Sequence, residues 1–252
     1  MSEMIAAVVG LFTGGLLNVL VDRLPPHEHV EGAGQLGGKP RQLEWWEYLP
    51  LASTAGAMML RRSPVENNRL RYLAVDLITA SLFFLAWHRF GEEPLVAVAV
   101  CVFSAAPVAL AFIDLETQFL PDRLVLPLLV VALAFSPFWP GREWWQGIAG
   151  AGVGYAVFYP LAWIGDRLDR DIMGWGDVKL SAAMGAMLGI PFLLIGLYIG
   201  IIAGGFVGAI VYSARMFGFR RTLIPYGPYL VLGGIVALYY GRTIIDWFLG
   251  QA

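Results

Sequence analysis

Four aspartates lie within or beside long apolar stretches of this sequence: Asp76, Asp114, Asp122 and Asp177. A carboxylate near the hydrocarbon of a membrane is energetically costly, so each calls for a structural or a chemical explanation. Two carboxylates held close together cannot both ionise. One then acts as a base on water while the other, protonated, polarises an amide carbonyl. A pair of these aspartates could therefore hydrolyse a peptide bond.

The position along the expected helices separates the four aspartates. Asp122 and Asp177 stand where helices begin, so either could be an N-cap that accepts backbone N–H groups and meets the positive end of the helix dipole. Asp76, five residues into a helix, is expected to pair with an arginine near the start of that helix or to reach the interface. Asp114 closes a helix, where the dipole disfavours a negative charge. It is the aspartate with no structural explanation.

Glycines and a lysine surround Asp177. Gly174 and Gly176 directly precede it, and because glycine has no side chain, the backbone beside Asp177 could approach an extended substrate closely. Lys179 follows two residues later, either as a substrate contact or as an anchor at the lipid headgroups, and we expect the anchor. Asp114 and Asp177 are therefore the candidate catalytic pair.

The composition defines the class of protein that positions these residues. Of the 252 residues 58% are hydrophobic and only 14% are charged, whereas a soluble domain is roughly 25% charged. This excludes a water-soluble globular domain and a disordered chain. The net charge of −2 provides no electrostatic footprint for nucleic acid. Cys101 is the single cysteine, which excludes an intramolecular disulfide and a cysteine-built zinc site.

The apolar stretches predict an all-α fold, a polytopic integral membrane protein with about eight transmembrane helices, since about 20 apolar residues make one span. They lie near 4–20, 71–88, 95–113, 123–139, 146–164, 178–190, 192–214 and 226–248. The pair around Pro191 could instead be one broken hairpin. We expect a first helix over 1–20, a cytoplasmic loop over 21–70 and a seven-helix membrane domain over 71–252.

The distribution of Lys and Arg predicts the orientation. The odd-numbered connections carry 14 of the 17 basic residues, and only Arg89, Arg142 and Arg242 fall on the other side. Because cytoplasmic loops carry the basic excess, both termini are expected outside the cytoplasm, with Asp114 and Asp177 at the cytoplasmic face. Trp45, Trp46 and Tyr48 of the long loop are expected at the headgroup level.

Small residues recur at every fourth position in two of the predicted helices. Such stripes let helix backbones approach closely, so they predict tight helix packing. They are Ser181, Gly185 and Gly189 in one helix and Gly196, Gly200, Gly204 and Gly208 in the next.

In four stretches the sequence resembles the type IV prepilin peptidase family, which are membrane aspartyl proteases of the Gly-x-Gly-Asp type. Phe112-Ile113-Asp114 with Leu120-Pro121-Asp122-Arg123 matches the first aspartate segment of the family, and Gly174-Trp175-Gly176-Asp177-Val178-Lys179 the second. Two further stretches match the family: Leu17-Asn18-Val19 with Arg23-Leu24-Pro25, and Ile224-Pro225-Tyr226-Gly227-Pro228-Tyr229. The four matches occur in order along nearly the whole chain.

The resemblance implies that Asp114 and Asp177 are catalytic and that Asp122 is an accompanying acid. It implies cleavage of leader peptides from type IV prepilins or type II secretion pseudopilins, at the cytoplasmic face of a bacterial inner membrane. Proteolysis by two aspartates needs no cofactor. Many relatives are also described as methylating the new N-terminus with S-adenosylmethionine.

The chain departs from the family in its long loop, where relatives carry two Cys-x-x-Cys pairs that bind zinc. This loop contains no cysteine, so we expect no metal, and His27 and His29 in the same loop are expected to be solvated. The departure leaves methyl transfer, and with it the need for S-adenosylmethionine, open. Three alternatives also stay open: an intramembrane protease with another membrane substrate, a non-catalytic assembly factor, and a proton-coupled transporter.

Overall fold

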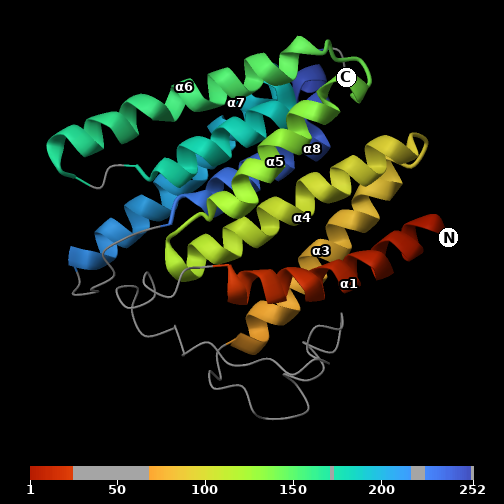
Figure 1. Ribbon diagram of the computed structural model, residues 1–252, viewed down its shortest axis with the longest axis horizontal. Helices are drawn as coiled ribbons and strands as arrows, with labels where there is room; N and C mark the ends of the chain where they lie inside the picture. Colours follow the sequence, from red (N-terminus) through yellow and green to blue (C-terminus); the bar gives the residue numbers. More distant parts are fainter. Residues whose placement is uncertain (25–67, 171–172, 217–224, 251–252) are drawn as a thin grey trace. The chain divides into compact units, whose positions relative to one another are not determined.

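The computed structural model describes residues 1–24, 68–170, 173–216 and 225–250, and these residues form helices joined by short connections (Figure 1). The predicted all-α class is confirmed. The elements are α1 (Ser2–Arg23), α3 (Asn68–Phe90), α4 (Pro94–Thr117), α5 (Asp122–Phe135), the 3₁₀ turn η3 (Ser136–Phe138), α6 (Trp145–Leu168), α7 (Trp175–Met216) and α8 (Gly227–Phe248). His27, His29, Trp45, Trp46 and Tyr48 lie outside the described residues.

Within the described residues, six helices are long and apolar enough to cross a membrane: α1, α3, α4, α6, α7 and α8. The predicted polytopic membrane protein is therefore confirmed. The remaining helix, α5, has 14 residues. Two of the expected spans, 178–190 and 192–214, lie within α7. The number of eight spans stays a prediction.

Helix α7 is a hairpin of two arms. The break is at Gly189, whose φ of 71° lies in the region that glycine alone adopts readily. Met184 packs against Gly234 of α8, while Gly196 packs against the neighbouring Gly233. Twelve residues of straight helix would separate Met184 and Gly196 by about 18 Å. The chain therefore folds back, and both ends of α7 lie toward the same side (Figure 1). We call 175–188 the first arm and 190–216 the second.

The chain divides into two units, Met1–Phe119 and Leu120–Ala252. In the first unit α1 packs along α3, and both contact α4. In the second unit α7 contacts α5, α6 and α8. The unit that contains Asp177 is thus organised around α7.

Close helix contacts form at Ser181, Gly185, Gly196 and Gly200 of the stripes, as predicted, whereas Gly189 is the break of α7 and faces the side chain of Arg142. A Cβ atom at Gly150 of α6 would overlap the carbonyl oxygen of Gly185, and one at Gly154 would overlap that of Ser181. In the second arm, a Cβ at Gly200 would lie 2.9 Å from the carbonyl oxygen of Tyr229. Only the absence of a side chain allows backbones to approach so closely. The first arm is therefore held directly against α6.

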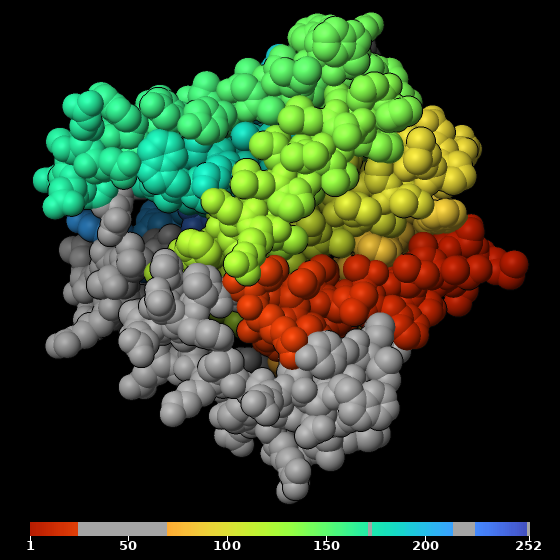
Figure 2. Space-filling model, viewed as in Figure 1, coloured from red at the N-terminus to blue at the C-terminus, as the bar shows by residue number. Residues whose placement is uncertain are grey.

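Large apolar side chains cover much of the outer surface. Helix α1 exposes Met4, Ile5, Val8, Phe12 and Leu16. The atoms of α1, in red, lie at the surface in Figure 2. Soluble monomers rarely expose continuous apolar patches of this extent. A lipid environment accounts for the exposure, since hydrocarbon covers such a face without penalty.

Candidate active site

Asp114 lies in the last turn of α4, which ends at Thr117, so its predicted position at a helix C-terminus is confirmed. The side chain is buried, with 5% of its surface exposed. Gln118 follows in the left-handed conformation at φ 55°, and its N–H donates to the carbonyl oxygen of Asp114 at 2.9 Å. This C-cap fixes the backbone of Asp114. The helix dipole at this end offers no support to a negative charge.

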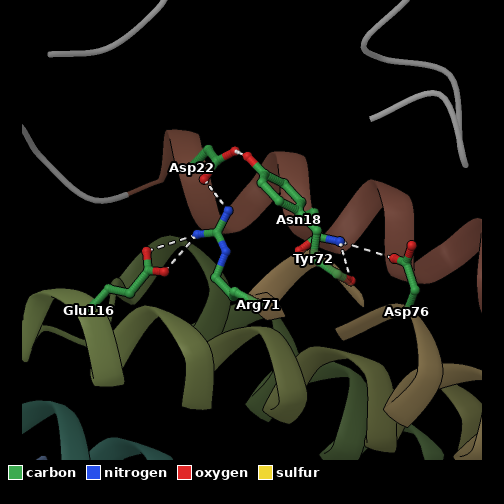
Figure 3. A network of polar contacts seen from close by, with 6 residues as sticks. All are labelled: Asn18, Asp22, Arg71, Tyr72, Asp76 and Glu116. Carbon is green, nitrogen blue, oxygen red and sulfur yellow. Dashed lines mark hydrogen bonds and ion pairs between the residues drawn. The ribbon is translucent and has the colours of Figure 1, made fainter. Parts of the chain in front are cut away.

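Arg71 joins the three helix ends around this position (Figure 3). It is buried and donates to both carboxylate oxygens of Glu116, at 2.9 and 2.8 Å, and to Asp22 at 2.5 Å. The Tyr72 hydroxyl donates to the other oxygen of Asp22 at 2.6 Å. Since Glu116 stands two residues after Asp114, this bidentate contact also restrains the end of α4 that carries Asp114.

Asp76 lies deeper between α1 and α3. It is only 3% exposed, so its carboxyl faces the neighbouring helices. Asn18 donates from Nδ2 to Oδ1 of Asp76 at 3.0 Å (Figure 3). Gly14 makes room for this contact, since a Cβ there would lie 2.8 Å from the same oxygen. The carboxyl of Asp76 is thus part of the packing of α1 against α3.

Asp177 is the third residue of α7 and is 9% exposed. Its predicted role as N-cap is wrong, because the helix begins at Trp175 and Asp177 lies inside the first turn. The backbone N–H of Asp177 donates to the carbonyl oxygen of Gly174 at 3.1 Å. A Cβ at Gly176 would lie 2.7 Å from Cβ of Leu120. Glycine at position 176 therefore allows the start of α7 to pack against the side chain of Leu120.

Asp122 and Lys179 form an ion pair. Nζ of Lys179 donates to both carboxylate oxygens of Asp122, at 2.8 and 2.7 Å. The predicted cap role of Asp122 is wrong, since Asp122 is the first residue of α5 and that helix has no side-chain cap bond. Both partners are partly exposed. The pair links the first turns of α5 and α7, beside Asp177.

Arg142 binds the opposite end of the first arm. Its guanidinium donates to the carbonyl oxygens of Met187 at 2.6 Å and Ala186 at 2.8 Å, and to Oγ of Ser136 at 3.0 Å. These carbonyls belong to the last turn before Gly189, so Arg142 caps that turn and meets the negative end of its dipole. Burial lowers the pKa of Arg142 to about 10, which leaves it charged at neutral pH.

Tyr226 stands directly before α8, near Asp177. Its ring packs edge-to-face on Phe158 of α6, with 5.9 Å between ring centroids. Burial raises the pKa of the Tyr226 hydroxyl, and the negative charge of Asp177 raises it further. Tyr226 therefore stays protonated at physiological pH and is a hydrogen-bond donor.

The residues that the structure describes contain no group of three or more His, Cys, Asp or Glu side chains able to hold a metal ion. Residues 25–67 of the long loop lie outside them. The described side chains near Asp177 include the Asp122–Lys179 ion pair and the Tyr226 hydroxyl.

A model of the type IV leader peptidase family matches residues 101–209 of this chain. Over 97% of its length, the chain is 30% identical to the prepilin leader peptidase/N-methyltransferase of Xanthomonas campestris, and the match covers 93% of that protein. The chain belongs to the type IV leader peptidase family. The protein of the same name from Pseudomonas aeruginosa is 31% identical, over 96% of this chain and 91% of that protein. The one from Aeromonas hydrophila is 37% identical, over 71% of this chain and 61% of that protein.

The family membership confirms the resemblance inferred from the motifs. The matched segment 101–209 contains Asp114, Asp122 and Asp177 with both glycines of the Gly-x-Gly-Asp string. No solved structure matches the chain.

Proposed function

We propose that this chain is a membrane aspartyl endopeptidase that removes leader peptides from type IV prepilins or type II secretion pseudopilins, with Asp114 and Asp177 as its catalytic carboxylates. One observation carries the proposal. In a chain of the leader peptidase family, the family-matched segment holds two buried carboxylates at the ends of apolar helices, with 5% and 9% of their surfaces exposed. Neither burial nor helix capping alone accounts for them.

The proposed hydrolysis uses one ionised and one protonated aspartate. The ionised carboxylate takes a proton from water, whose oxygen attacks the carbonyl carbon, while the protonated carboxyl gives its proton to the carbonyl oxygen. In the collapse of the resulting gem-diol the C–N bond breaks, the amine nitrogen takes the proton of the first aspartate and a hydroxyl proton returns to the second. One water is consumed and no cofactor takes part. The pair titrates as a unit.

The ion pair and Arg142 fix the position of the first arm of α7, which carries Asp177. Lys179 and Asp122 link the first turn of α7 to α5, and Arg142 binds its first arm at the other end through two carbonyl oxygens. Geometric precision matters here, because a misplacement of about 1 Å in a reacting group can reduce a rate about 100-fold. Asp122, Lys179, Gly174 and Gly176 are accessory residues in this proposal.

The proposed setting is the bacterial inner membrane, with both termini outside the cytoplasm and cleavage at the cytoplasmic face. The excess of Lys and Arg in the odd-numbered connections supports this orientation. The exposed apolar side chains of the membrane helices contact lipid, and seven helices over 71–252 form the peptidase domain. The partners are prepilin or pseudopilin substrates, and nucleic acid is not among them.

The test is leader removal from a purified prepilin in detergent. We expect wild type to cleave and Asp114→Asn and Asp177→Asn to lose activity by at least about 1,000-fold, with unchanged thermal unfolding. Asp166→Asn is the matched control, because Asp166 is an exposed carboxylate that accepts from Trp175 Nε1 at 2.9 Å. Cleavage by either catalytic variant contradicts the mechanism.

The same samples separate the remaining alternatives. Prepilin binding without cleavage by wild type indicates an assembly factor, and ion uptake into proteoliposomes indicates a transporter. Cleavage of a different membrane protein in place of prepilin indicates another substrate class. Because the relatives are named N-methyltransferases, mass spectrometry of the product with S-adenosylmethionine present determines whether methyl transfer accompanies cleavage.

A further inference from the structure

The packing of α6 against the first arm of α7 identifies what lies beside Asp177. The two helices run antiparallel, with Gly150 against Gly185 and Gly154 against Ser181. Each step of four residues toward the C-terminus of α6 corresponds to four residues toward the N-terminus of α7. The next step pairs Phe158 with Asp177. The register therefore puts Phe158, whose side chain is buried, on α6 opposite Asp177.

A contact between two aromatic side chains next to Phe158 and Asp177 agrees with this pairing of α6 and α7. Tyr159 of α6 packs edge-to-face on Trp175, with 5.8 Å between ring centroids. Phe158 in turn holds the ring of Tyr226 at 5.9 Å. Tyr226 thus reaches the vicinity of Asp177 through one intervening ring.

The ring of Tyr226 is also held from the second arm of α7. A Cβ at Gly204 would lie 2.8 Å from Cε2 of Tyr226 and 3.3 Å from its Cδ2, so the ring lies directly on the glycine. Because both Gly204 and Phe158 contact the ring, they restrict where its hydroxyl can lie. The charge of Asp177 acts on this hydroxyl, as the raised pKa of Tyr226 indicates. A protonated, fixed donor is therefore available near one carboxylate of the proposed pair.

We propose that Tyr226 is a further catalytic residue, whose hydroxyl donates a hydrogen bond to the carbonyl oxygen of the scissile peptide bond. The proposal rests on the proposed function. As water adds to the carbonyl carbon, negative charge develops on that oxygen. A donor fixed in advance stabilises this charge without reorganisation. The hydroxyl keeps its own proton throughout, so it changes none of the bonds formed or broken in hydrolysis.

The main test compares Tyr226→Phe with Tyr229→Phe in the prepilin assay. Tyr229 is the matched control, since it lies one turn along α8 and its ring also contacts Gly204, with its Cδ2 3.3 Å from a Cβ there. Phenylalanine keeps each ring, so packing and thermal unfolding stay the same. We expect Tyr226→Phe to lower kcat about 100-fold with KM within about twofold, and Tyr229→Phe to behave as wild type.

A second pair of variants tests the ring position. Gly204→Ala adds a methyl group that pushes the Tyr226 ring away, whereas Gly205→Ala meets nothing within 4 Å. We expect kcat to fall for Gly204→Ala and to stay at the wild-type value for Gly205→Ala. Equal kcat values for Gly204→Ala and Gly205→Ala would contradict the assignment, even if one aromatic variant folds poorly.

The outcomes separate this assignment from the proposed function. If Asp177→Asn is inactive while Tyr226→Phe cleaves with wild-type kcat, the Tyr226 assignment alone is wrong. If Asp177→Asn still cleaves, the proposed function fails and this assignment fails with it. A shift in the limbs of the pH–rate profile of Tyr226→Phe, in place of a fall in kcat at all pH values, also overturns the assignment, because it indicates that the hydroxyl acts on the carboxylates.

Discussion

Replacement of Gly150 by alanine tests the close contact between α6 and the first arm of α7. The added methyl carbon would lie 2.9 Å from the carbonyl carbon of Gly185, closer still to its oxygen, and 3.1 Å from Cα of Gly189. Ordinary contact begins at 3.4 Å. All of these atoms are backbone and cannot rotate away, so the two helices must separate. Gly152→Ala is the matched control, because a Cβ there meets nothing within 4 Å.

The expected magnitude follows from the size of the overlap. Forcing an extra methyl group into a packed contact costs about 1–3 kcal/mol in free energy of unfolding. Alanine recovers up to about 1 kcal/mol of helix propensity at either position. We therefore expect Gly150→Ala to lose about 2 kcal/mol relative to Gly152→Ala. In a chain of this size, this corresponds to a decrease of about 4–8 °C in Tm.

The activity should fall as well, since separation of the helices moves the arm that carries Asp177. A displacement of about 1 Å predicts a loss of cleavage of up to about 100-fold. Both variants are measured in one detergent, by circular dichroism during heating and by prepilin cleavage. If Gly150→Ala unfolds and cleaves as Gly152→Ala does, the helices do not touch at Gly150 and the reasoning is refuted.

Other perturbations follow from the same contacts. Arg142→Met leaves two carbonyl oxygens without their charged donor, and we expect a loss of about 1.5–3 kcal/mol in unfolding free energy, measured by thermal unfolding; an unchanged Tm would contradict the cap. Gly189→Ala forces alanine to a φ of 71° and a ψ of 172°, which costs about 1–3 kcal/mol in the same measurement. Lys179→Ala removes an exposed ion pair with Asp122 and should lower Tm by no more than about 4 °C, since such pairs contribute up to about 1 kcal/mol. Dialysis against EDTA should leave prepilin cleavage unchanged, and loss of cleavage that zinc restores would show that the reaction depends on a metal.

Features that depend on local chemistry could be predicted from the sequence. The spans follow from the apolar runs, and the position of Asp114 at a helix end follows from the polar string after Ile113. The packing of Gly185, Gly196 and Gly200 follows from their spacing, because residues four apart share one face of a helix. The break of α7 at Gly189 lies beside Pro191, where the sequence indicated a junction, while the contacts with α8 show that the chain folds back there.

Features that depend on distant partners could not be predicted. Asp122 and Asp177 have the sequence context of N-caps, but a helix that begins one or two residues earlier or later changes the role of the carboxylate. Arg142 was notable only as a basic residue on the less basic side, and its partners are backbone carbonyls 44 and 45 residues away. Tyr226 was visible only as one letter of a motif. Its importance arises from the ring of Phe158 and the space left by Gly204.

The shortness of α5 has a consequence for the surrounding lipid. Its 14 residues span about 21 Å, whereas the hydrocarbon core of a bilayer is about 30 Å thick. Leu126, Val130 and Val131 are exposed on its surface. Where lipid contacts this short helix, we expect the acyl chains to shorten and the bilayer to be locally thinned. A polar backbone that approaches along α5 would then cross less hydrocarbon, which lowers the energy needed to bring a scissile peptide bond to the proposed carboxylates.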